Sequence, residues 1–174
     1  MYILSVISFL LLGGFLLLAA MRFGIPSMVS DVYYQLQGCT GSEVIGDKAK
    51  RNYGWVFTAV MVTCAVLMMV CMLDTGKGVQ CLAFIGCGGL MFVGAVPNYL
   101  DADAYPIHKG GAIVAAAGCV GWCLSVCWVP TAVIALIYLL LVSCLDDDEG
   151  YKPVWYMAEV AGFLDVFVTY WITN

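Results

Sequence analysis

The chain has 174 residues, of which 63% are hydrophobic and 11% are charged, and its net charge is −5. A soluble domain carries about 25% charged residues and about 45 to 50% apolar ones, so this composition argues against a water-soluble core and predicts that lipid surrounds most of the chain. The acidic balance leaves no basic patch that could neutralise phosphates, which argues against a nucleic acid as a partner.

The first predicted membrane span covers residues 2–21 and ends before Arg22. A helix needs about 20 apolar residues to cross the hydrocarbon core. This run lacks a basic n-region and a small-residue cleavage site, so we interpret it as a retained helix and not as a cleaved signal peptide. Residues 23–53 are then predicted to form an interfacial loop, in which Ser27 or Ser30 caps a short helix.

Five further hydrophobic runs are divided by the same length rule. Residues 107–145 are too long for one crossing, because 39 helical residues at about 1.5 Å each would reach nearly twice the hydrocarbon thickness, and Pro130 is expected to mark a tight reversal. The predicted spans after the first are 54–73, 79–96, 107–128, 130–145 and 153–173. The predicted fold class is therefore an all-α integral membrane protein, a six-transmembrane-helix bundle with short loops that forms a single domain over residues 1–174.

Lysine and arginine are distributed unequally between the two sides of this six-span arrangement. The loops after the first, third and fifth spans hold Arg22, Lys48, Lys50, Arg51, Lys109 and Lys152. The opposite side holds only Lys77. Positively charged loops favour the cytoplasmic side of a membrane, so both termini are expected to face outward.

Cysteine is abundant, but eight of the nine cysteines lie in or at the ends of apolar spans, where they pack as small hydrophobic side chains. Cys119, Cys123 and Cys127 fall on one stripe of a helix, and packing is favoured there over a soft-metal site. The single histidine, His108, leaves a zinc site short of three further ligands. No metal and no cofactor are therefore expected.

Small residues are concentrated in the third and fourth spans. At a spacing of four residues they lie on one helix face and let two helix backbones approach closely in lipid. Such sets are Gly111, Ala115 and Cys119, and Ala117, Gly121 and Ser125. We expect these two spans to form the packed centre of the bundle.

The last span carries two carboxylates, Glu159 and Asp165, which are the strongest functional clue in the sequence. A carboxylate near the middle of a spanning helix costs about 2.5 to 3.5 kcal/mol on insertion scales, so it needs a partner, a proton or a function. Six residues separate the two, which is about 9 Å along a helix and about 240° around it. They are not expected to act as a paired dyad.

The predicted topology brings the polar residues near several span ends to one membrane face. Glu159 should reach this face, where His108 and Lys109 are its expected partners. For each polar residue the alternative is a structural role, and for Asp165 this is burial as a protonated acid or a subunit contact. The candidate ligand-binding residues are His108, Glu159, Asp31, Asp101, Asp103, Lys109 and Asp165.

Three short segments resemble small six-helix bacterial membrane proteins of unknown function. They are residues 25–31 after the first span, 92–97 at the end of the third and 107–112 at the start of the fourth. More remotely, the pattern is similar to the DUF998 and Frag1/DRAM-like groups, which also have six helices, a histidine that opens the fourth and an acidic residue in the last. The resemblance implies a compact bundle with a polar pocket at one face, in a bacterial inner membrane. It implies no particular reaction and no catalytic residues.

Three function classes follow from these features. The favoured one is a non-enzymatic bundle that binds or moves a small ligand, lipid or ion through the polar pocket. The second is a membrane enzyme that acts on lipid headgroups with His108 as base and an aspartate as its orienter, although no GxSxG motif or phosphate-binding glycine loop occurs. The third is a structural or accessory subunit. Membrane lipids are the expected partners, and a homo-oligomer is a further alternative.

Overall fold

The computed structural model describes residues 1–38, 53–145 and 153–174, and within these residues every regular element is an α-helix. This confirms the all-α prediction for the described part of the chain. The helices are α1 (Tyr2–Phe23), α2 (Asp31–Leu36), α3 (Gly54–Asp74), α4 (Gln80–Ala95), α5 (Tyr105–Val126), α6 (Trp128–Ser143) and α7 (Val154–Thr173).

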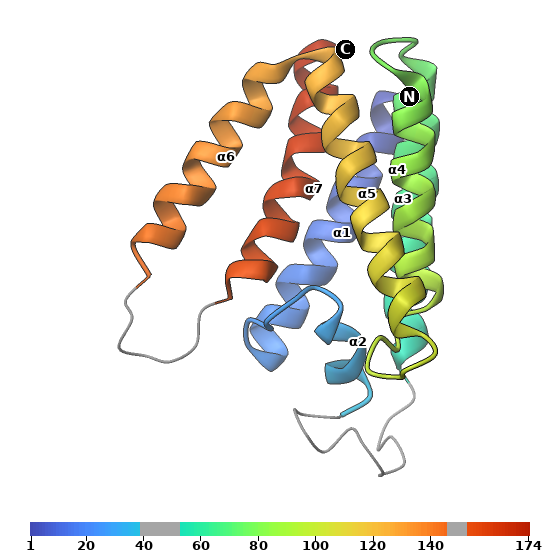
Figure 1. The fold of residues 1–174 in the computed structure, drawn as a ribbon, viewed down its shortest axis with the longest axis vertical. Helices are drawn as coiled ribbons and strands as arrows, with labels where there is room; N and C mark the ends of the chain where they lie inside the picture. Colours follow the sequence, from blue (N-terminus) through green and yellow to red (C-terminus); the bar gives the residue numbers. More distant parts are fainter. Residues whose placement is uncertain (39–52, 146–152) are drawn as a thin grey trace.

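The six long helices run lengthwise through the molecule, and the short helix α2 lies across one end of them (Figure 1). We call this end the α2 end. Both chain termini lie at the opposite end, which we call the terminal end (Figure 1). The chain therefore passes along the bundle an even number of times. The connection that follows α1 and the connection that follows α4 both lie at the α2 end (Figure 1).

Three helices, α1, α3 and α5, are long and apolar enough to cross a membrane, judged by length and composition. The helices α4 and α6 are apolar but have 16 residues each, which is about 24 Å of helix against about 30 Å of hydrocarbon. Helix α7 has 20 residues, but it carries Glu159 and Asp165. Six crossings therefore remain a prediction.

The closest approach in the bundle is between α4 and α5, which share the most extensive helix–helix interface of the described residues. A Cβ atom added at Gly118 would lie 2.6 Å from the Cα of Gly86, and one added at Gly89 would lie 2.6 Å from the backbone nitrogen of Ala115. Only glycine allows backbones to come this close. The expected packing of the third and fourth spans through small residues is confirmed at these positions.

Trp122 on α5 is the largest fully buried side chain, with 0% of its surface exposed. Its indole N–H donates to the backbone carbonyl of Lys77, at 3.1 Å, in the turn between α3 and α4. In the same turn the N–H of Val79 donates to the hydroxyl of Ser125, at 3.0 Å. The α5 helix therefore holds this turn at the terminal end through two hydrogen bonds.

The first and last helices are joined through polar and aromatic contacts near the terminal end. The indole N–H of Trp171 donates to the hydroxyl of Ser5 at 3.0 Å, and Ser5 is fully buried. The ring of Phe9 lies edge-on to those of Phe167 and Trp171, with centroids 5.3 and 5.0 Å away. The Ser5 hydroxyl itself donates to the carbonyl of Tyr2, at 2.7 Å, so α7 adds a donor to a hydroxyl that is already bonded within α1.

The reversal between α5 and α6 lies at Cys127 and not at Pro130, so the predicted position was wrong. Cys127 has extended dihedrals, with φ −159° and ψ 113°, whereas Pro130 lies in the first turn of α6. Proline is tolerated there because the first backbone N–H groups of a helix have no acceptor within it. The two helices are therefore joined through a single extended residue.

Helix α6 is the least enclosed of the long helices. Pro130 is its only buried residue, and its main helix contacts are with α7 and α5. Towards the α2 end it diverges from the rest of the bundle (Figure 1). Most of its apolar surface is therefore open to whatever surrounds the protein.

Candidate functional site

The first turn of α7 holds the backbone between α1 and α2 at the α2 end. The N–H of Tyr156 has no acceptor within its own helix and donates to the carbonyl of Ser27, at 2.9 Å. One turn further on, the carboxylate of Glu159 accepts the N–H of Val29, at 2.5 Å. The half-buried Glu159 thus forms a side-chain hydrogen bond with the turn before α2.

Asp31, at the start of α2, is bonded from two sides. One carboxylate oxygen accepts the N–H of Met28, at 3.0 Å, and the other accepts the phenol O–H of Tyr99. The neighbouring phenol oxygen of Tyr34 accepts the N–H of Leu100, at 2.9 Å. These bonds fix α2 to the segment between α4 and α5.

His108 lies in the first turns of α5 and is 7% exposed. Its Nδ1 is 2.7 Å from the carbonyl oxygen of Val96, and its Nε2 is 2.8 Å from the hydroxyl oxygen of Ser30. A carbonyl can only accept a hydrogen bond, so Nδ1 carries the proton and donates it. When the ring is neutral, Nε2 is the acceptor of the Ser30 O–H.

Two tyrosines in this network are shielded from water. Burial raises the pKa of Tyr99 well above its ordinary value of 10.0, and the bond to Asp31 raises it further. Burial likewise raises the pKa of Tyr34. Both phenols are therefore expected to remain neutral at pH values where an exposed tyrosine ionises.

The raised pKa of Tyr99 predicts a loss of stability in alkali. The unfolded chain ionises Tyr99 near pH 10 while the folded chain does not, so its contribution is complete below pH 10 and declines as the pH rises above it, by at most about 1.4 kcal/mol per pH unit. The unfolding temperature of the wild type should fall more steeply above pH 10 than that of Tyr99→Phe, in a thermal titration of the two proteins in detergent. Parallel curves would contradict this.

Asp101 and Asp103 were expected to join the polar pocket, but the structure places both on the surface. A carboxylate oxygen of Asp101 accepts the N–H of Asp103, at 3.1 Å, which is a local turn contact. No described residue from another helix bonds to either carboxylate. Of the expected set, the structure brings together Asp31, Glu159 and His108 around the turn before α2.

The expected partners of Glu159 were wrong. His108 bonds to Ser30 and Val96, and the ammonium of the exposed Lys109 lies over the ring of Tyr105, 5.5 Å from its centroid. Adjacent helical residues point about 100° apart, so burying His108 turns Lys109 out of the bundle. Glu159 instead accepts a hydrogen bond from the backbone N–H of Val29. No pattern of side chains in the sequence indicates such a bond.

Asp165 lies apart from the residues at the α2 end. Its side chain is 3% exposed, and it accepts the hydroxyls of Thr131 on α6, at 3.0 Å, and Thr169 on α7, at 3.3 Å. These contacts link α7 to the N-terminal part of α6. The separation of the two α7 carboxylates expected from helix geometry is therefore present in the structure.

Asp31 and Glu159 form a pair of carboxylates without a compensating cation among the described residues. Each accepts a backbone N–H from the same turn, Met28 for one and Val29 for the other. The turn before α2 thus donates hydrogen bonds to two acidic side chains.

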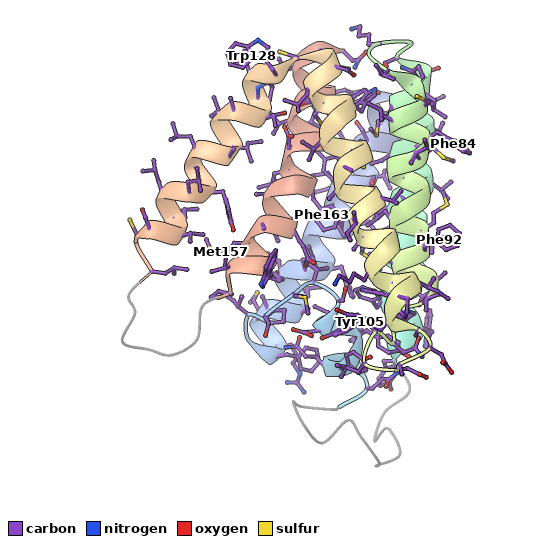
Figure 2. The ribbon with its side chains drawn as sticks, viewed as in Figure 1. Phe84, Phe92, Tyr105, Trp128, Met157 and Phe163 are labelled. Atoms are coloured by element: carbon purple, nitrogen blue, oxygen red, sulfur yellow. The ribbon has the colours of Figure 1, made fainter. Side chains whose placement is uncertain are left out.

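An open apolar groove of about 460 Å³ runs along the outer face of α4 and α5. Phe84 and Phe92, two of its lining residues, point outward from α4 (Figure 2). It is hollow at Gly88 and Gly110, where an added Cβ would meet nothing within 4 Å. Its lining contains no charged residue, so the groove is not the polar pocket expected from the sequence.

The Ser30–His108 pair was not predicted. Ser30 was expected to cap a helix, and it does occupy the N-cap position of α2, but its hydroxyl makes no capping bond. The Ser30 hydroxyl instead contacts Nε2 of His108 on α5, which is 78 positions further along the chain. The one sequence signal is that a lone histidine at the start of an apolar run needs a polar partner once it is buried.

The described residues contain no group of three or more His, Cys, Asp or Glu side chains that could hold a metal ion. Comparisons with known proteins add no relative. The chain matches no protein-family model, no curated protein and no solved structure.

Proposed function

We propose that the chain is an integral membrane protein in which all six long helices cross the bilayer. Three of them are long and apolar enough, and an even number of passes agrees with the two termini at one end of the bundle (Figure 1). The shorter α4 and α6 would be accommodated by local thinning of the bilayer. The resemblance to bacterial six-helix proteins favours a bacterial inner membrane.

Aromatic and basic residues support this placement. Tyr105 lies at the α2 end and Trp128 at the terminal end (Figure 2), and both are exposed, as in the aromatic belts of membrane proteins. Arg22 and Lys109 belong to the α2 end, while Lys77 belongs to the turn at the other. By the positive-inside rule the α2 end faces the cytoplasm and the termini face outward.

The site at the α2 end favours binding of a small ligand with a positive charge. The observation that carries this proposal is the pair of carboxylates, Asp31 and Glu159, with no cationic partner among the described side chains. A carboxylate within a spanning helix is costly and is retained where it binds or pairs. Since the described residues offer no cluster of metal ligands, an organic ammonium group fits better than a metal ion.

Ethanolamine is a suitable probe for this proposal. Purified protein in detergent should unfold at a higher temperature as ethanolamine is added, with a stabilisation of about 2.7 kcal/mol at 100 times the dissociation constant. Glu159→Gln and Asp31→Asn keep a hydrogen-bond acceptor for the turn but remove the charge. Each is expected to weaken the response by about 10-fold in affinity, which corresponds to about 1.4 kcal/mol.

The matched control is Asp101→Asn, because Asp101 is exposed and bonds only within its own turn. It should respond to ethanolamine as the wild type does, and glycerol, which carries no charge, should leave all variants unchanged. If ethanolamine fails to stabilise the wild type, or stabilises Glu159→Gln equally, the ligand proposal is wrong. A purely structural role for these carboxylates would then be favoured.

A further inference from the structure

Ser30 and His108 have the geometry of a nucleophile and its base. The hydroxyl oxygen of Ser30 is 2.8 Å from Nε2 of His108, within the range of a direct proton transfer. The opposite ring nitrogen is held by the carbonyl of Val96, at 2.7 Å. This is the arrangement of an activated serine, in which a third group orients the base.

The tautomer is the one that catalysis requires. Because Val96 can only accept, Nδ1 is protonated and the lone pair of Nε2 faces the Ser30 hydroxyl. The carbonyl of Val96 therefore takes the positioning role that an aspartate plays in other serine nucleophile sites. The sequence predicted that an aspartate would orient His108, and in the structure the backbone carbonyl of Val96 does so instead.

Ser30 has helical dihedrals, with φ −64° and ψ −23°, and the first N–H groups of α2 bond to backbone carbonyls of the preceding turn. A serine at an N-cap normally accepts a backbone N–H of the first helical turn, and this bond contributes about 1 kcal/mol. Here the side chain makes no such bond and is directed at His108 across the interface with α5. Because those N–H groups already have backbone acceptors, the Ser30 hydroxyl is available to bond to His108.

We propose that Ser30 is a nucleophile, with His108 as its general base, for acyl transfer from a carboxylic ester of a membrane lipid. The substrate class rests on the membrane placement proposed above, because the α2 end would lie at the level where lipid ester groups meet the polar headgroups. The Asp31 and Glu159 pair has no part in this chemistry. Activity at Ser30 and binding at the carboxylates can therefore fail independently.

The reaction uses only the ester and water. The Ser30 oxygen bonds to the acyl carbon while its proton passes to Nε2, and Nε2 then gives that proton to the alkoxide as the ester C–O bond breaks. This yields an acyl-serine and a free alcohol. Water next attacks the acyl carbon and passes a proton to Nε2, which returns it to Ser30 as the acyl-serine bond breaks and a carboxylic acid leaves.

A fluorophosphonate probe tests the nucleophile without requiring the natural substrate. In detergent-solubilised protein the Ser30 oxygen should displace fluoride from phosphorus, and the lost proton leaves with the fluoride. Mass spectrometry should place the label on Ser30. Ser30→Ala should abolish labelling, and His108→Asn should slow it by about 100-fold or more, the usual contribution of a general base.

Ser27→Ala is the matched control, since Ser27 lies in the same turn but contributes its backbone carbonyl to the network. It should label at the wild-type rate. An unlabelled wild type, a label on any other serine or an unchanged rate in His108→Asn would each overturn the proposal. Because the first two outcomes use the wild-type protein, they do not depend on the folding of a variant.

Discussion

Replacing Gly118 with alanine is expected to lower the free energy of unfolding of the bundle by about 3 kcal/mol, the upper part of the usual range for overpacking. The added Cβ would lie 2.6 Å from both the nitrogen and the Cα of Gly86 and 2.8 Å from the carbonyl oxygen of Leu82. These are backbone atoms, which cannot rotate away as a flexible side chain would. The helices α4 and α5 must therefore move apart, and their shared packing is lost along the whole interface.

The measurement is the unfolding transition in a denaturing detergent titration, followed by circular dichroism or tryptophan fluorescence. Gly110→Ala is the matched control on the same helix, because a Cβ there meets nothing within 4 Å. Alanine at Gly110 should be neutral or stabilise by up to about 1 kcal/mol through its helix propensity. Equal losses in the two variants would show that close contact of α4 and α5 does not determine stability.

Trp122→Ala is expected to destabilise the bundle by about 3 to 5 kcal/mol, as large-to-small changes of buried aromatic residues do. The indole is completely enclosed, so its removal leaves a cavity whose lining atoms lose their contacts. It also leaves the carbonyl of Lys77 without the indole N–H. Lipid chains do not compensate, since the cavity lies inside the protein.

Trp122→Phe separates the two contributions in the same unfolding experiment. Phenylalanine keeps most of the packing but cannot donate to Lys77, whose carbonyl retains the side-chain amide of Gln80 as a donor, so the expected loss is about 1 to 2 kcal/mol. A phenylalanine variant as unstable as the alanine variant would mean that the bond to the turn outweighs the packing. A stable alanine variant would contradict the central position of Trp122.

Helix content was predictable because it depends on local information. The length of each apolar run indicates a helix, and each of the six long helices lies over one such run. Of the two sets of small residues at a spacing of four, Gly111, Ala115 and Cys119 lie against α4 as predicted. Ala117 and Ser125 of the other set are exposed. The reversal at Cys127 was missed because proline is as compatible with the first turn of a helix as with a turn.

The partners of the polar residues were not predictable for a different reason. Glu159 binds a backbone N–H, and every residue except proline carries one, so no residue type marks the position. Pairing Ser30 with His108 depends on how the turn before α2 is rotated over the end of α5, which is a tertiary property. Charge pairing suggested Lys109 for Glu159, but the burial of His108 directs Lys109 outward.

The bond between Trp171 and Ser5 joins the beginning of the chain to its end. A ribosome makes α1 long before it makes α7, so during synthesis the Ser5 hydroxyl bonds to the carbonyl of Tyr2 in its own helix and lacks the Trp171 donor. During that interval the main helix contacts of α1 are with α3. The contact between α1 and α7 therefore forms only after all the intervening helices have been made, and a chain that stops before Trp171 lacks the indole that donates to Ser5.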